Sequence, residues 1–79
     1  MKPAKIFNLG LIGCGSFGQF CLQAFSRIPE VRIYAVVDVD PGLVKKMTKL
    51  YHCSGYEDAE QLIKIPEIDL VHLVTPPAS

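Results

Sequence analysis

Six consecutive residues, from Gly13 to Gly18, have the spacing glycine-x-glycine-x-x-glycine, which suits the binding of a phosphate. Gly13 permits a tight turn after a strand, Gly15 lets the backbone approach a pyrophosphate, and Gly18 lets the following helix pack close to that strand. The free backbone N–H groups at the start of the helix would then face the phosphates. The motif therefore predicts a dinucleotide-binding turn, and the alternative is a glycine-rich turn that serves packing alone.

An acidic residue, Asp38, stands about 20 residues after this turn, at the end of a β-branched run. Its carboxylate is expected to accept hydrogen bonds from the hydroxyls of an adenosine ribose and to repel a 2′-phosphate. The next residue is Val39 rather than an arginine that could hold such a phosphate. We therefore expect NAD as the cofactor, with NADP less favoured. Capping of the strand end is the alternative role of Asp38, whereas Asp40, which precedes Pro41, fits a helix cap better.

The hydrophobic pattern around these residues alternates between strand and helix along the chain, which predicts an α/β fold with a parallel sheet. The expected strands cover residues 5–12, 31–37, 52–55 and 68–74, and the expected helices cover residues 16–28, 41–51 and 57–64. Right-handed crossovers then give a Rossmann-type sheet in the order 3-2-1-4, with helices on both faces. Residues 1–79 would form the N-terminal portion of a dinucleotide-binding domain, a partial domain whose fourth strand is an open edge.

Helical spacing also predicts which side chains each helix buries. The expected inward residues are Phe17, Phe20, Cys21, Ala24 and Ile28 in the first helix, Val44, Met47 and Tyr51 in the second, and Ala59, Leu62 and Ile63 in the third. The lysines of the second helix are expected to face water near its C-terminus.

Composition argues against several classes of protein. Eight basic and eight acidic residues give a net charge of zero, so we expect no nucleic-acid partner. No apolar run approaches the roughly 18 residues of a membrane helix. The three cysteines cannot all pair within the chain and lack metal-ligand spacing, so we expect free thiols, no metal site and a cytoplasmic location. A lipoprotein signal ending at Cys14 is disfavoured, because the apolar run before it is short and contains Asn8 and Gly10.

Three further residues could carry chemistry. His72 lies in an apolar strand, where a hydrogen-bonded core histidine is a better interpretation than a catalyst. His52 lies near a helix end and is interpreted as a cap or a surface group. Cys14 lies at a helix N-terminus, where the pKa of a thiol can be lowered, but a redox role is disfavoured because the sequence offers no partner cysteine.

Four segments together resemble the Gfo/Idh/MocA oxidoreductases, the family of glucose–fructose oxidoreductase and inositol 2-dehydrogenase. They are the glycine segment 11–18, the strand end Val36-Val37-Asp38, the segment Tyr56-Glu57-Asp58, and residues 68–77, which are similar to the family's fourth strand with its Thr-Pro dipeptide. The resemblance covers essentially the whole chain. It implies cofactor contacts around the pyrophosphate, at the ribose and on the nicotinamide side, from Gly13, Gly15, Ser16, Phe17, Gly18, Asp38, Thr75, Pro76 and Pro77.

The resemblance implies a parent enzyme that moves a hydride between the nicotinamide of NAD(P) and a hydroxyl-bearing carbon of a sugar, cyclitol or similar substrate. The family's Glu-Lys-Pro motif, with its catalytic lysine, would lie beyond Ser79, so no catalytic residue is assigned. The substrate domain, through which family members often form homo-oligomers, is absent as well. Two alternatives use a similar glycine turn: a non-enzymatic NAD-sensing module, and a methyltransferase-type domain that binds S-adenosylmethionine, against which the segment 75–77 argues.

Overall fold

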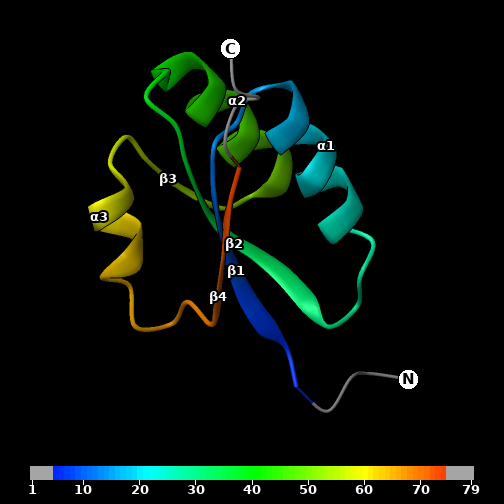
Figure 1. Cartoon of the computed structure of the whole chain (residues 1–79). Helices are drawn as coiled ribbons and strands as arrows, with labels where there is room; N and C mark the ends of the chain where they lie inside the picture. The colour runs from blue at the N-terminus through cyan, green and yellow to red at the C-terminus, as the bar shows by residue number, and fades with distance from the viewer. Residues whose placement is uncertain (1–4, 75–79) are drawn as a thin grey trace.

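The computed structural model describes residues 5–74, in which strands and helices alternate as the sequence predicts (Figure 1). The strands are β1 (Phe7–Ile12), β2 (Val31–Val37), β3 (Ser54–Tyr56) and β4 (Leu70–Leu73). The helices are α1 (Ser16–Phe25), α2 (Pro41–Tyr51) and α3 (Ala59–Ile63).

The described strands form one parallel sheet in the order β3-β2-β1-β4, which confirms the predicted Rossmann-type arrangement. α1 and α2 pack on one face of the sheet and α3 packs on the other (Figure 1). The helices change face because the chain reverses its direction across the sheet after β3, while each crossover stays right-handed. The carboxyl ends of β1 and β2 therefore meet at one edge, where the glycine turn and Asp38 follow.

Two helix ends differ by more than one residue from the predicted ones because of local hydrogen bonds. α1 ends at Phe25 rather than at residue 28, since the N–H of Arg27 donates to the carbonyl of Ala24 and tightens the chain into a turn. α3 begins after Asp58 rather than at residue 57, since the Asp58 carboxylate accepts a hydrogen bond from the N–H of Glu60 at 3.0 Å. The end of α1 depends on backbone hydrogen bonds of a turn and the start of α3 on a side-chain cap, and a hydrophobic pattern locates neither.

The predicted inward face of α1 is wrong. The residues buried in α1 are Gly18 and Leu22, and Cys21 is half-buried. The predicted inward residues that the structure exposes are Phe17, Phe20, Ala24 and Ile28. The rotation of the helix is set by Gly18, because a Cβ atom there would collide with the carbonyl oxygen of Gly13. Close approach of Gly18 to the turn therefore directs Leu22, one turn further along, into the core.

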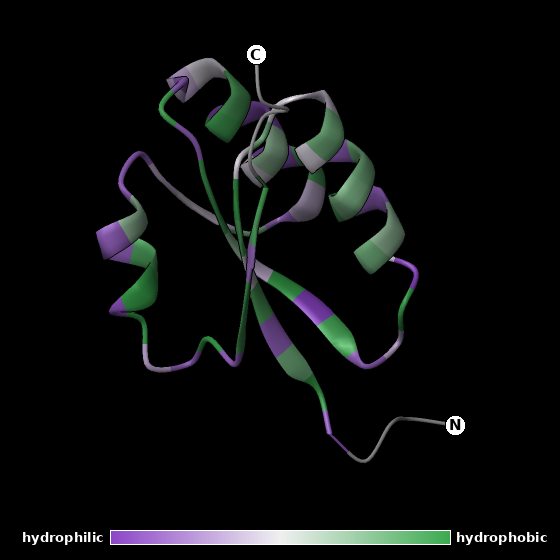
Figure 2. Cartoon of the chain, viewed as in Figure 1, coloured by the Kyte–Doolittle hydropathy of each residue, from purple (hydrophilic) through white to green (hydrophobic). Residues whose placement is uncertain are grey.

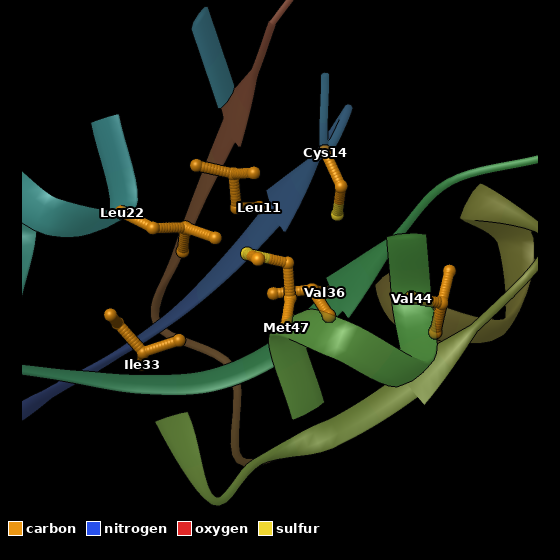
Figure 3. Packing of buried hydrophobic residues seen from close by; sticks show 7 residues of the cluster. All are labelled: Leu11, Cys14, Leu22, Ile33, Val36, Val44 and Met47. Atoms are coloured by element: carbon orange, nitrogen blue, oxygen red, sulfur yellow. The ribbon is translucent and has the colours of Figure 1, made fainter. Parts of the chain in front are cut away.

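Apolar side chains form a core on each face of the sheet. Between the sheet and the first two helices lie Leu11, Cys14, Leu22, Ile33, Val36, Val44 and Met47 (Figure 3). On the opposite face, Leu62 of α3 packs with Ala35 and Val37 of β2, whereas Ile63 is 62% exposed and was wrongly predicted to face inward. The sheet thus has an apolar core on each face, and hydrophobic residues predominate along its central strands (Figure 2).

Asn8 fixes the start of β4 beside β1. Its N–H donates to a carboxylate oxygen of Asp69 at 2.8 Å, and the N–H of Asp69 donates back to the Asn8 carbonyl at 2.8 Å. The Asn8 side-chain amide also donates to the carbonyl of Glu67 at 3.0 Å. These bonds set the pairing of Leu9 with Leu70, so that β4 runs toward the glycine turn along β1.

Candidate dinucleotide-binding site

The turn between β1 and α1 requires glycine at two positions for reasons within the chain. Gly13 has a φ of 106°, a left-handed conformation that side chains disfavour, and its N–H donates to the carbonyl of Val37 at 2.7 Å. At Gly18, a Cβ atom would collide with the Gly13 carbonyl. Gly13 builds a tight turn and Gly18 brings α1 close to it, which are the roles that the sequence pattern predicts for them.

Gly15 differs from its neighbours, because within residues 5–74 no atom beyond its chain neighbours and its own helix lies within 4 Å of the position that its Cβ would occupy. Its backbone is extended, with a φ of −69°, so neither conformation nor packing within the described chain calls for glycine there. Gly15 is also the N-cap of α1, and no side chain caps the helix. The exposed N–H groups of the first turn and the open space above Gly15 therefore form a cradle that fits a pyrophosphate.

Cys14 is held in the turn by three hydrogen bonds. Its N–H donates to an Asp38 carboxylate oxygen at 2.6 Å, and its thiol donates to the carbonyl of Val37 with a sulfur–oxygen distance of 3.6 Å. Its carbonyl accepts a bond from the side-chain amide of Gln19 at 3.0 Å. Gln19 therefore braces the turn from α1. The glycine motif did not indicate this role, because the only sign of it in the sequence is a glutamine side chain one turn into the helix.

The position of Cys14 at the helix N-terminus does not lower the pKa of its thiol. This pKa is raised to about 11, mainly because the thiol is buried. The negative charge of Asp38 and the neighbouring Cys53 make smaller contributions in the same direction. The side chain is fully buried beneath the turn rather than exposed to the helix end. A buried, protonated thiol is a packing and hydrogen-bonding group, not a nucleophile.

The Asp38 carboxylate lies at the carboxyl end of β2 and joins two backbone segments. One oxygen accepts the Cys14 N–H, and the other accepts the N–H of Asp40 at 2.9 Å. A carboxylate offers about four lone-pair positions, so two remain for the hydroxyls of a ribose. Capping of the strand end and ribose binding are therefore compatible roles for Asp38.

Asp40 is a helix cap, as predicted. Its Oδ1 atom accepts hydrogen bonds from the N–H groups of Gly42 and Leu43 at 2.9 and 3.4 Å, and Pro41 occupies the first turn of α2. The carboxylate of Asp40 is thus engaged with α2, and Asp38 is the acid that faces the glycine turn.

A surface pocket of about 320 Å³ lies beside the turn and the end of β2. Its lining residues are Ile12, Gly13, Val37, Asp38, Val39, Glu57, Asp58 and Ala59. The pocket joins the start of the glycine turn to the ends of β2 and β3, where apolar groups and carboxylates alternate. This mixture suits a flat ring with an attached ribose better than an anion.

The remaining predicted site residues lie at the margin of the described chain. Ser16 and Phe17 are exposed in the first turn of α1, and the Phe17 ring stacks on Phe20 with a centroid distance of 6.1 Å. The N–H of Val74 donates to the carbonyl of Ile12 at 2.8 Å, so β4 approaches the glycine turn. The predicted contacts of Thr75, Pro76 and Pro77 lie outside the described residues.

Neither histidine is placed as a catalyst. The His72 ring is half-buried in β4 and meets Phe25 edge-on, with a centroid distance of 5.3 Å. Among the described residues, its recorded contact is this packing against Phe25, and none of them forms a hydrogen bond with the ring. His52 caps α2 in a left-handed conformation with a φ of 54°, as expected of a residue at a helix end, and β3 therefore starts at Ser54. None of the helices within residues 5–74 has the length and apolar character needed to cross a membrane.

The fold and the glycine turn define a Rossmann-type unit of the kind that binds dinucleotides. Residues 7–79 match the model of the Gfo/Idh/MocA family, described as an oxidoreductase family with an NAD-binding Rossmann fold, and the chain belongs to this family. The predicted resemblance is thereby confirmed.

Relatives of the chain include two curated bacterial proteins. One is a dTDP-3,4-didehydro-2,6-dideoxy-alpha-D-glucose 3-reductase from Saccharopolyspora spinosa, 30% identical over 96% of this chain and 22% of the relative. Another is a glycosyl hydrolase family 109 protein from Porphyromonas gingivalis, 38% identical over 86% of this chain and 17% of the relative. The chain thus spans about a fifth of the length of the relatives it matches.

Among solved structures, the chain is similar to a myo-inositol dehydrogenase from Lactobacillus casei in complex with NAD(H) and myo-inositol. The TM-score is 0.82 at 25% sequence identity, over 89% of this chain and 22% of the dehydrogenase.

Proposed function

We propose that this chain is the N-terminal, cofactor-binding portion, residues 1–79, of a dinucleotide-binding domain in an NAD-dependent oxidoreductase. The parent protein would transfer a hydride between the nicotinamide and a hydroxyl-bearing carbon of a sugar, cyclitol or similar substrate. The observation that carries the proposal is the open cradle above Gly15, next to the carboxylate of Asp38. The relatives that act on a deoxysugar and on myo-inositol support the substrate class.

The proposed residue roles are supported by the geometry of the turn. Gly13, Gly15 and Gly18, with the N–H groups of Ser16 and Phe17, would hold the pyrophosphate. Asp38 would accept hydrogen bonds from the adenosine ribose with its two remaining lone-pair positions. From the resemblance alone, Thr75, Pro76 and Pro77 would line the nicotinamide half.

We further propose that NAD is preferred over NADP. A carboxylate at the ribose accepts a 2′-hydroxyl but repels a 2′-phosphate, and Asp38, at the end of β2, is the acid proposed for that position. The residue after it, Val39, is 88% exposed and offers no positive charge.

The nicotinamide supplies the hydride chemistry when it is bound, and the chain contributes binding and orientation. The hydrogen bond between Asp38 and the Cys14 N–H fixes the carboxylate proposed to bind the ribose relative to the turn proposed to bind the pyrophosphate. The brace from Gln19 restrains the same turn from the helix side. Such preorganisation lowers the cost of ordering the site when a ligand binds.

Calorimetric titration with NAD and NADP tests this proposal, with Gly15→Ala as the critical variant. Because no atom of the described residues beyond its chain neighbours and its own helix lies near the Gly15 Cβ position, this variant should keep the unfolding temperature of the unaltered protein while NAD affinity falls about tenfold or more. Gly42→Ala, also at the start of a helix, is the matched control and should retain NAD affinity. A folded protein that binds neither cofactor would overturn the proposal.

A second candidate activity is glycoside hydrolysis, favoured by the 38% identity to the glycosyl hydrolase family 109 protein. The two activities are separated by incubating the complete gene product with polyols and with glycosides. Net formation of NADH from a polyol supports the oxidoreductase, whereas release of a sugar without net NADH supports hydrolysis. A protein that binds NAD but performs neither reaction would fit the NAD-sensing module.

The cytoplasmic location, the lack of a nucleic-acid partner and the formation of a homo-oligomer remain predictions.

A further inference from the structure

We propose that Glu57 is a second specificity-determining carboxylate, which acts with Asp38 to disfavour a cofactor that carries a 2′-phosphate. This inference rests on the proposed function and extends it to a residue that neither the glycine motif nor the acid after β2 predicts. Glu57 follows β3, and it lies at the site because β3 pairs with β2, the strand that ends before Asp38.

The strand register places Glu57 next to Asp38. Val37 of β2 pairs with Tyr56 of β3, and the N–H of Asp38 donates to the Tyr56 carbonyl at 3.3 Å. Asp38 and Glu57 are therefore the first residues beyond two neighbouring parallel strands, which lie about 4.8 Å apart. Both residues therefore lie at the carboxyl-terminal end of the sheet.

Asp38 and Glu57 also line the same surface pocket of about 320 Å³ beside the glycine turn. Neither lysine nor arginine is among the described residues that line it. A third acid, Asp58, also borders the pocket, but its carboxylate caps α3 by accepting the Glu60 N–H. Glu57 is exposed and has no capping role, so its charge remains available to act on whatever occupies the pocket.

The charge of the ligand decides the effect of Glu57. A phosphate monoester carries close to two negative charges near neutral pH, whereas the corresponding hydroxyl of NAD carries none. If Asp38 holds the ribose, the 2′ position lies about 5 to 10 Å from Glu57, which is one to two spacings between neighbouring strands. At about 7 Å in a largely aqueous dielectric, one carboxylate should weaken binding of the phosphorylated cofactor about three- to tenfold, and leave NAD unaffected.

The test compares dissociation constants for NAD and NADP in the complete gene product and in Glu57→Gln, by isothermal titration calorimetry. NADP affinity should rise about three- to tenfold at low salt while NAD affinity stays unchanged. Glu57→Lys, which reverses the charge, should raise NADP affinity further. Glu60→Gln is the matched control, since it removes an exposed acid from α3 that does not line the pocket.

Salt provides a second readout, because the effect is electrostatic. The gain in NADP affinity should shrink in about 1 M salt, where the Debye length is about 3 Å. An unchanged ratio of NADP to NAD affinity in both Glu57 variants would overturn the inference, as would a loss of NAD affinity, which would indicate direct contact with the cofactor. Failure of the unaltered protein to bind NAD would instead overturn the proposed function.

Discussion

The carboxylate of Asp38 accepts a hydrogen bond from the backbone N–H of Cys14 at 2.6 Å, across a separation of 24 residues. The bond ties the end of β2 to the glycine turn that follows β1. The residue proposed to hold the ribose thus also shapes the turn proposed to hold the pyrophosphate. Changes at Asp38 should therefore affect both stability and cofactor binding.

Asp38→Ala should abolish measurable NAD binding and lower the free energy of unfolding by about 1.5–3 kcal/mol, the usual worth of hydrogen bonds to a charged group. The loss arises because the N–H groups of Cys14 and Asp40 lose their acceptor. Titration calorimetry and urea unfolding measure the two effects. Full retention of NAD affinity would show that Asp38 serves the fold alone.

Asp40→Ala is expected to separate stability from binding. It removes the acceptor for the first N–H groups of α2, and should lower the free energy of unfolding by about 1 kcal/mol. NAD affinity should stay within error of the unaltered protein, because the Asp40 side chain faces α2. Urea unfolding and calorimetry test this pair of outcomes, and a large loss of NAD affinity would contradict the assignment of Asp40 as a cap.

The Cys14 thiol should make stability fall at high pH. Its pKa is raised from 9.0 to about 11 in the folded chain, so the protonated thiol stabilises the fold below pH 9, and this stabilisation is lost as pH rises through 11. The loss should reach about 2 kcal/mol for this group. Denaturant unfolding across this range measures it, and Cys14→Ala, which cannot ionise, is the control for other groups. Identical pH profiles for both proteins would disprove the assignment.

The rotation of α1 can be tested with two substitutions of similar size. Leu22→Ala opens a cavity in the core and should cost about 2–5 kcal/mol of unfolding free energy. Phe20→Ala removes a side chain that is 64% exposed and should change this free energy by at most about 0.5–1 kcal/mol. Thermal or urea unfolding distinguishes the two, and a larger cost at Phe20 would restore the face that the sequence pattern predicted.

Local signals in the sequence determined much of the fold. The Asp40-Pro41 pair located the start of α2 because a cap acts within three residues of itself. The glycine spacing located the turn at Gly13, since its left-handed φ is a property of that residue alone. Alternation of strands and helices, together with the fixed hand of crossovers, then left the sheet order β3-β2-β1-β4.

Only the tertiary structure decided features that depend on distant residues. Hydrophobic spacing in α1 favoured its aromatic face, but close packing of Gly18 against Gly13 turned that face outward. The helix N-terminus suggested a lowered pKa for the Cys14 thiol, but burial beneath the turn raised it. Glu57 reaches the pocket through the pairing of β2 with β3. The sequence by itself determined what acts over one helical turn and, through the fixed hand of crossovers, the sheet order. Burial, helix rotation and charge proximity are instead set by contacts between segments far apart in the chain.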